Sequence, residues 1–102
     1  MKNDNDNVFS EDFLALGPQS VASSRGYTLN SAGRDALEYV EGLRRLMIPA
    51  ELDAEPIVVF ISEAEAWESP VGREPVNEAD RERLSRNVSA ALRYLRLPCK
   101  IR

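Results

Sequence analysis

Apolar and polar positions along the chain predict strands in the first two thirds and one long helix near the end. The most hydrophobic run is IVVFI at residues 57–61. It combines β-branched and aromatic residues over a strand-like length, with proline only at its entry. Because both faces of this run are apolar, we expect the strand to lie inside a sheet or to be covered on both sides.

The segment that begins at Asn77 is the clearest helix. Asn77 is a favourable N-cap residue, and Asp80 three positions later completes a pattern close to a capping box. Apolar side chains line one face of the helix at Leu84, Val88, Ala91, Leu92 and Leu95. Pro98 ends the helix, and the last residues, CKIR, are long enough for a short edge strand.

Residues 19–52 are compatible with two different structures. In the first, residues 36–47 form a helix with apolar side chains on one face and Gly42 in its middle, where glycine costs about 1 kcal/mol relative to alanine. In the second, residues 36–40 and 43–48 are two strands joined at Glu41 and Gly42, after an earlier strand in GYTLN. The periodicity alone does not separate the helix from the hairpin.

The remaining segments complete the predicted architecture. Residues 1–8 are rich in Asn and Asp, as in a flexible leader. Ser10 is placed to cap a short helix over the next apolar residues, ending at Gly17. Residues 68–76 contain two prolines and a glycine, which is typical of a loop. Together the elements predict one α+β domain over residues 9–102: a small, mainly antiparallel sheet packed against one long C-terminal helix, with a short N-terminal helix.

Composition restricts the chemistry that the chain can perform. The 102 residues include no histidine and a single cysteine, Cys99. The usual general base near neutral pH and the commonest metal ligand are therefore missing. One cysteine forms no internal disulfide, no apolar run approaches the roughly 20 residues that span a bilayer, and the acidic N-terminus is unlike a signal peptide. We expect a cytoplasmic protein that is not an enzyme and that binds no cofactor, metal or membrane.

Charge is distributed unevenly along the chain. Residues 1–80 contain 6 Lys or Arg and 16 Asp or Glu, whereas residues 81–102 contain 7 and 1. An acidic body repels nucleic-acid phosphates and attracts basic partners. The C-terminal arginines are not accompanied by interleaved aromatic residues or a phosphate-binding loop, and the sequence pI is about 4.8. We therefore expect a protein partner and no nucleic acid.

The candidate contact surface centres on the only tryptophan. In ISEAEAW, an extended backbone would place Glu63, Glu65 and Trp67 on one side. An aromatic ring flanked by negative charge suits a basic groove of a partner. In one alternative, Trp67 covers the core and the glutamates keep the loop soluble; in another, the carboxylates perform acid–base chemistry or hold magnesium. The candidate contact residues are Glu51, Asp53, Glu63, Glu65, Trp67 and Glu68.

Three segments together resemble a family of small bacterial immunity proteins: EYVEGLRRLMIPAEL, IVVFISEAEAWESP and VNEADRERLSRNVSAALRYLRLPCKI. The similarity covers roughly residues 26–101. It rests on a Tyr-x-Glu-Gly turn, a central strand, a tryptophan followed shortly by proline, and one long helix before a final strand. Leu43 stands where a second glycine is expected. The matching residues are Tyr39, Glu41, Gly42, Arg45, Ile48, Glu51, Trp67 and Pro70.

The resemblance favours the hairpin at residues 36–48 and implies a function. Such proteins accompany polymorphic or contact-dependent growth inhibition toxins and neutralise the toxic C-terminal domain in the cytoplasm of the producing cell. Many of these toxins are nucleases with basic clefts. The resemblance implies that this chain, as a monomer, binds a cognate toxin domain in a 1:1 complex and occludes its active site or another required surface. The alternative is a small regulatory or accessory subunit that binds another protein.

Overall fold

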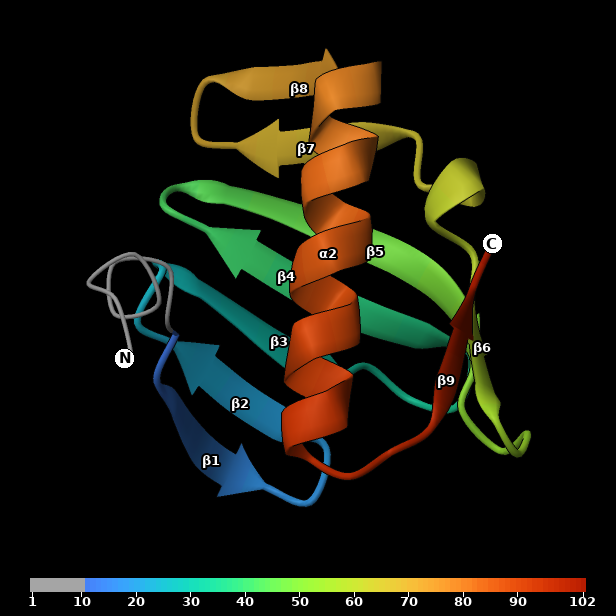
Figure 1. Cartoon of the computed structure of the whole chain (residues 1–102). Helices are drawn as coiled ribbons and strands as arrows, with labels where there is room; N and C mark the ends of the chain where they lie inside the picture. The colour runs from blue at the N-terminus through green and yellow to red at the C-terminus, as the bar shows by residue number, and fades with distance from the viewer. Residues whose placement is uncertain (1–10) are drawn as a thin grey trace, which may run out of the picture.

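The fold is a curled, mostly antiparallel sheet with one helix, as the computed structural model of the chain shows (Figure 1). The structure describes residues 11–102, so the predicted leader at residues 1–8 and Ser10 lie outside the described residues. Its elements are β1 (Phe13–Gly17), β2 (Ser20–Ser23), β3 (Tyr27–Ser31), β4 (Ala36–Glu41), β5 (Arg44–Glu51), β6 (Ile57–Val59), a 3-10 turn (Ile61–Glu63), β7 (Ala66–Ser69), β8 (Gly72–Pro75), α2 (Glu78–Tyr94) and β9 (Cys99–Ile101).

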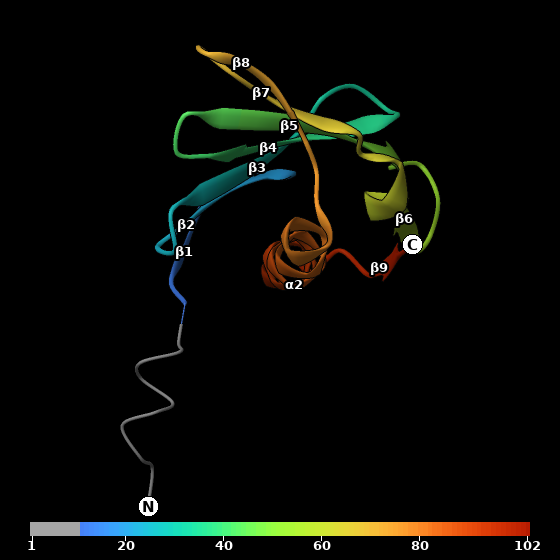
Figure 2. The same ribbon diagram turned by 90° about the horizontal axis from the view of Figure 1, so that it is seen from above.

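The sheet follows the order β1-β2-β3-β4-β5-β6-β9, and the β7–β8 hairpin joins β5 by pairing Arg45 with Glu68. The β6–β9 pair is parallel, and every other pair among the described strands is antiparallel. Seen from above, the sheet curls around α2 and leaves its outer face open (Figure 2). Within residues 11–102, no helix is long and apolar enough to cross a membrane.

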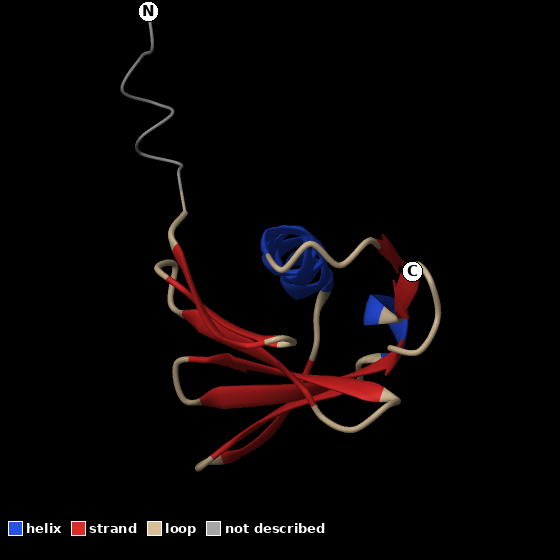
Figure 3. Cartoon of the chain, turned by 90° about the horizontal axis from the view of Figure 1, so that it is seen from below, coloured by secondary structure: helices blue, strands red, loops and turns tan. Residues whose placement is uncertain are grey.

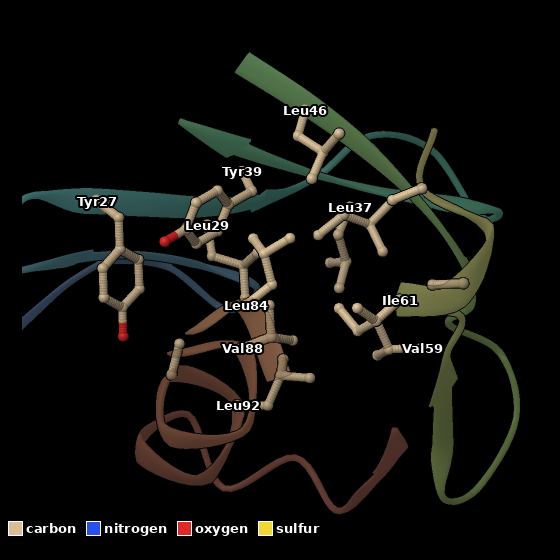
Figure 4. Close-up of a cluster of buried hydrophobic side chains, with 14 of the residues drawn as sticks. Tyr27, Leu29, Leu37, Tyr39, Leu46, Val59, Ile61, Leu84, Val88 and Leu92 are labelled. Carbon is tan, nitrogen blue, oxygen red and sulfur yellow. The ribbon is translucent and has the colours of Figure 1, made fainter. Parts of the chain in front are cut away.

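The core fills the space between the inner face of the sheet and α2. Along β3, β4 and β5 the buried residues alternate with partly exposed ones, as expected for strands that bury one face. Leu84, Val88 and Leu92 of α2 point toward Leu29, Leu37 and Tyr39 of the sheet (Figure 4). The helix therefore closes the concave side of the sheet.

The predicted C-terminal helix and its cap are confirmed. The side chain of Asn77 accepts a 2.8 Å hydrogen bond from the backbone N–H of Asp80, and the Asp80 carboxylate accepts one from the backbone N–H of Asn77. These two bonds satisfy backbone donors that a helix start otherwise leaves without partners. The helix ends at Tyr94, before Pro98, and the predicted strand after it is β9.

The hairpin alternative for residues 36–48 is confirmed, and the helix alternative is wrong. Strands β4 and β5 pair directly, with Glu41 opposite Arg44 and a two-residue loop, Gly42 and Leu43, between them. Gly42 has a φ of 63°, and Leu43 has no positive φ. One glycine at the first loop position is the requirement of a type II′ turn, so the second glycine is unnecessary.

Two predictions are wrong: the N-terminal helix and the loop at residues 68–76. The expected N-terminal helix is instead β1, which pairs with β2 through Phe13 opposite Ser23 (Figure 3). A helix of one or two turns makes few internal hydrogen bonds, so pairing with a strand prevails. The expected loop at residues 68–76 is the β7–β8 hairpin, whose turn contains Pro70. The strand predicted at 57–61 forms between β5 and β9 but ends at Val59.

Candidate protein-binding surface

The outer face of β5 carries the alternate residues that the core does not use. Leu46, Ile48 and Ala50 are buried beneath the sheet, so the residues between them point outward. Met47 lies on this outer face with 46% of its surface exposed. An exposed methionine on an open sheet face is a flexible apolar surface that a partner could cover.

Three of the predicted contact glutamates gather beside Met47. Glu63 comes from the 3-10 turn, Glu65 from the segment before β7, and Glu68 from β7. They border a surface pocket of about 240 Å³ together with Met47, Pro49, Ala66 and Arg73. The fold therefore brings together carboxylates that the sequence placed in one short segment.

Glu51 at the end of β5 and Asp53 in the turn that follows extend this surface. Glu51 is exposed two residues after Pro49, which borders the glutamate pocket, so their Cα atoms are about 6.5 Å apart on the same face of the strand. Asp53 and Glu51 line a neighbouring pocket of about 350 Å³ with Asp35 and Arg34. We call the exposed carboxylates along this path the acidic strip: Glu51, Asp53, Glu63, Glu65 and Glu68.

Local ion pairs neutralise only part of the acidic strip. Arg45 lies 3.5 Å from Glu68 and 3.4 Å from Glu38, and Arg34 lies 3.2 Å from Asp53. These pairs are exposed, so each contributes at most about 1 kcal/mol. Among the described residues, no cation lies within ion-pair distance of Glu51, Glu63 or Glu65. The strip consequently keeps negative charge that a partner can meet.

Trp67 does not belong to this surface, which corrects its place among the predicted contact residues. No part of the side chain is exposed, and it lies in the core as the alternative interpretation expected. The 3-10 turn takes Glu63 out of an extended backbone, and β7 begins only at Ala66, so neither Glu63 nor Glu65 belongs to the strand that carries Trp67. In β7, Trp67 points inward and Glu68 points outward.

A buried polar network around Trp67 was not predicted. The indole Nε1 donates a 3.0 Å hydrogen bond to Oδ2 of Asp80, and Arg44 stacks over the ring at 4.1 Å from its centroid. Arg83 donates two hydrogen bonds to Glu41, at 2.9 and 2.8 Å, and one to Asp80 at 3.1 Å. Only the capping-box pattern at Asp80 gave a local signal, because the other partners come from distant strands.

The same network continues through two buried tyrosines. Tyr39 donates a 2.8 Å hydrogen bond to Glu41 and accepts one of 2.9 Å from Asn87, while Tyr27 donates to the backbone carbonyl of Asn87. Burial raises the pKa of both tyrosine hydroxyls, so they stay protonated as donors. Every member of the network has a hydrogen-bond partner, so the network holds the sheet and the helix together.

Hydrogen bonds and charges in this network lower the pKa values of its two carboxylates, Glu41 and Asp80. Burial alone would raise the pKa of Glu41, but hydrogen bonds from Arg83 and Tyr39 outweigh it and lower the pKa. For Asp80, burial is likewise outweighed by hydrogen bonds from Trp67, the Asn77 backbone and Arg83, so its pKa is also lowered. Both carboxylates are therefore held ionised beside Arg83, and neither is poised to exchange a proton near neutral pH.

The acidic strip does not have the geometry of a metal site. In the part of the chain from residue 11 onward, no three Asp, Glu or Cys side chains are positioned to hold a metal ion.

Comparisons with protein-family models, with curated protein sequences and with solved structures found no match to this chain.

Proposed function

We propose that this protein is an immunity protein, which binds a cognate toxin domain in the cytoplasm of the producing bacterium and neutralises it. The observation that carries the proposal is the gathering of Glu63, Glu65 and Glu68 with the exposed Met47 on the open outer face of the sheet. The resemblance of the sequence to immunity proteins gives the partner its class.

Electrostatics support a basic partner for this surface. Glu51, Glu63 and Glu65 have no ion-pair partner among the described residues, and their negative charge raises the encounter rate with a positively charged domain. A nuclease has a basic cleft that binds phosphates, and a row of carboxylates can accept hydrogen bonds from the same basic side chains. We therefore propose that the toxin is a nuclease and that the strip occludes its active site or another required surface, in a complex of one copy each.

Met47 takes the role that the sequence gave to Trp67. Interfaces combine an apolar centre with a polar rim, and methionine is among the residues enriched there. Met47 lies beside Pro49 among the glutamates of the pocket. The proposed interface thus has an apolar contact at Met47 surrounded by carboxylates.

The test measures association between the purified chain and the product of the neighbouring gene, which we propose is the toxin. We expect the double variant Glu63→Lys/Glu65→Lys to reduce the association rate by about tenfold or more, with the loss largest at low salt. The control is Glu78→Lys/Glu82→Lys, which makes the same charge change at two exposed positions of α2. Equal association rates for the two double variants would show that the acidic strip is not the interface.

A further inference from the structure

A second charged surface lies along α2 and has the opposite sign. Arg86, Ala90 and Arg93 are spaced four and three residues apart, so they share one face of the helix. Ser85 and Ser89 lie beside them. Two turns of helix separate Arg86 from Arg93, which is about 10.5 Å along the helix axis.

This helix face and β9 enclose a continuous groove, which we call the basic groove. One part is a pocket of about 470 Å³ between Arg86, Ala90 and Ile101. The second part is a pocket of about 310 Å³ lined by Arg96, Leu97, Pro98 and Cys99. The two pockets share Ser89 and Arg93, so they adjoin along the helix.

The basic groove contains no acidic side chain. Among the described residues, no carboxylate lies within ion-pair distance of Arg86, Arg93 or Arg96. The other arginine of this helix face, Arg83, is instead fully engaged with Glu41 and Asp80. Three guanidinium groups therefore line a groove whose floor also has apolar atoms from Leu97, Pro98 and Ile101.

We propose that the basic groove binds an acidic peptide segment of a protein partner, with carboxylates on the three arginines and an apolar side chain between them. Arginine forms paired hydrogen bonds with carboxylates, and the fork of donors makes such contacts specific. This surface is separate from the acidic strip, because the pockets of the groove share no lining residue with the pockets of the strip. The helix α2, which carries the arginines, lies inside the curl of the sheet (Figure 2).

Charge and composition favour a peptide over a nucleic acid. Residues 1–80 have a large excess of acidic side chains, which repel a long polyanion that extends beyond the groove. The groove lining includes no aromatic residue on which a base could stack. Tyr94 is exposed nearby, but its ring stacks on Phe13 with centroids 4.9 Å apart.

The test uses a fluorescein-labelled peptide with three glutamates on each side of one leucine, measured by fluorescence anisotropy with the full chain. We expect Arg93→Glu to weaken peptide binding by about tenfold or more, because it replaces an attraction at the centre of the groove by a repulsion. The matched control is Arg73→Glu, at an exposed position on β8, which should change the dissociation constant by less than about twofold. Arg86→Glu, in the middle of the helix, provides a second variant if Arg93→Glu fails to fold.

Three results would overturn the proposal. The first is no binding of the peptide to the unaltered chain, and the second is equal weakening by Arg93→Glu and Arg73→Glu. The third is binding of a single-stranded oligonucleotide, lost in Arg93→Glu, when the peptide does not bind. Arg93→Glu should leave association with a basic toxin domain at or above its original rate, so failure here is distinguishable from failure of the acidic strip.

Discussion

The indole Nε1 of Trp67 donates a 3.0 Å hydrogen bond to the carboxylate of Asp80, which also accepts the backbone N–H of Asn77. One carboxylate thus joins the β7 strand to the first turn of α2. The only tryptophan is consequently part of the framework that positions the β7–β8 hairpin against the sheet. Its glutamate neighbours remain on the surface because β7 turns alternate side chains to opposite faces.

The first prediction concerns this junction. Replacing Trp67 by alanine removes a fully buried ring and leaves Asp80 without one of its donors, so we expect the free energy of unfolding to fall by about 3–5 kcal/mol. Urea unfolding followed by circular dichroism measures this loss. Leu43→Ala removes a side chain that is 81% exposed and should change stability by less than about 0.5 kcal/mol. Similar stabilities for both variants would contradict the assignment of Trp67 to the core.

The second prediction concerns the hydrogen bonds of Tyr39. Its hydroxyl donates to Glu41 and accepts from Asn87 in a buried setting. Tyr39→Phe leaves these two groups short of a partner, and we expect a loss of about 1–3 kcal/mol in unfolding free energy. Tyr94→Phe is the control, since Tyr94 is exposed and stacks through its ring. An equal effect of the two substitutions would mean that the hydroxyl of Tyr39 adds nothing to stability.

The third prediction is a loss of stability in acid. The pKa values of Glu41 and Asp80 are lowered in the folded state, so both groups stabilise the fold above their unfolded pKa values of about 4. That stabilisation disappears as the pH falls from about 4.5 through the lower folded values. Urea unfolding between pH 7 and pH 3 should show the decline, and Glu41→Gln should make it shallower. The same steep decline in Glu41→Gln would place its origin elsewhere.

The fourth prediction tests the β4–β5 turn. Gly42 has a positive φ of 63°, a conformation that costs other residues about 1–2 kcal/mol. Gly42→Ala should lower the unfolding free energy by that amount, as measured by thermal or urea unfolding. Leu43→Ala, at the adjacent loop position without a positive φ, is again the control. An unchanged stability of Gly42→Ala would show that the turn does not require glycine.

Local patterns predicted the elements whose own residues determine them. The helix from Glu78 to Tyr94 has its cap and its apolar face written in one continuous segment, and the β6 strand has a run of β-branched residues. Periodicity alone did not distinguish the β4–β5 hairpin from a helix, because the spacing of its apolar residues fits both. In the structure β4 pairs along its whole length with both β3 and β5, and the spacing of apolar residues within one segment does not reveal such pairing.

The errors arose where pairing with another strand outweighs local preference. β1 is a strand because β2 is beside it, and residues 66–75 form a hairpin because β5 supplies a pairing position at Arg45. Within the candidate site, the sequence indicated five carboxylates, and the fold places three of them around the pocket beside Met47 and the other two at a pocket by the end of β5. The sequence could not reveal that Trp67 faces inward, because the predicted alternation needs an extended backbone from Glu63 to Trp67, whereas β7 begins only at Ala66.

The most direct measurement is growth of a bacterial strain that produces the product of the gene beside this chain's own, which we propose is the cognate toxin. The unaltered chain and Glu78→Lys/Glu82→Lys should both restore growth, whereas Glu63→Lys/Glu65→Lys, produced at the same level and folded, should not. Growth restored equally by both double variants, or no growth with the unaltered chain, would contradict neutralisation through the acidic strip.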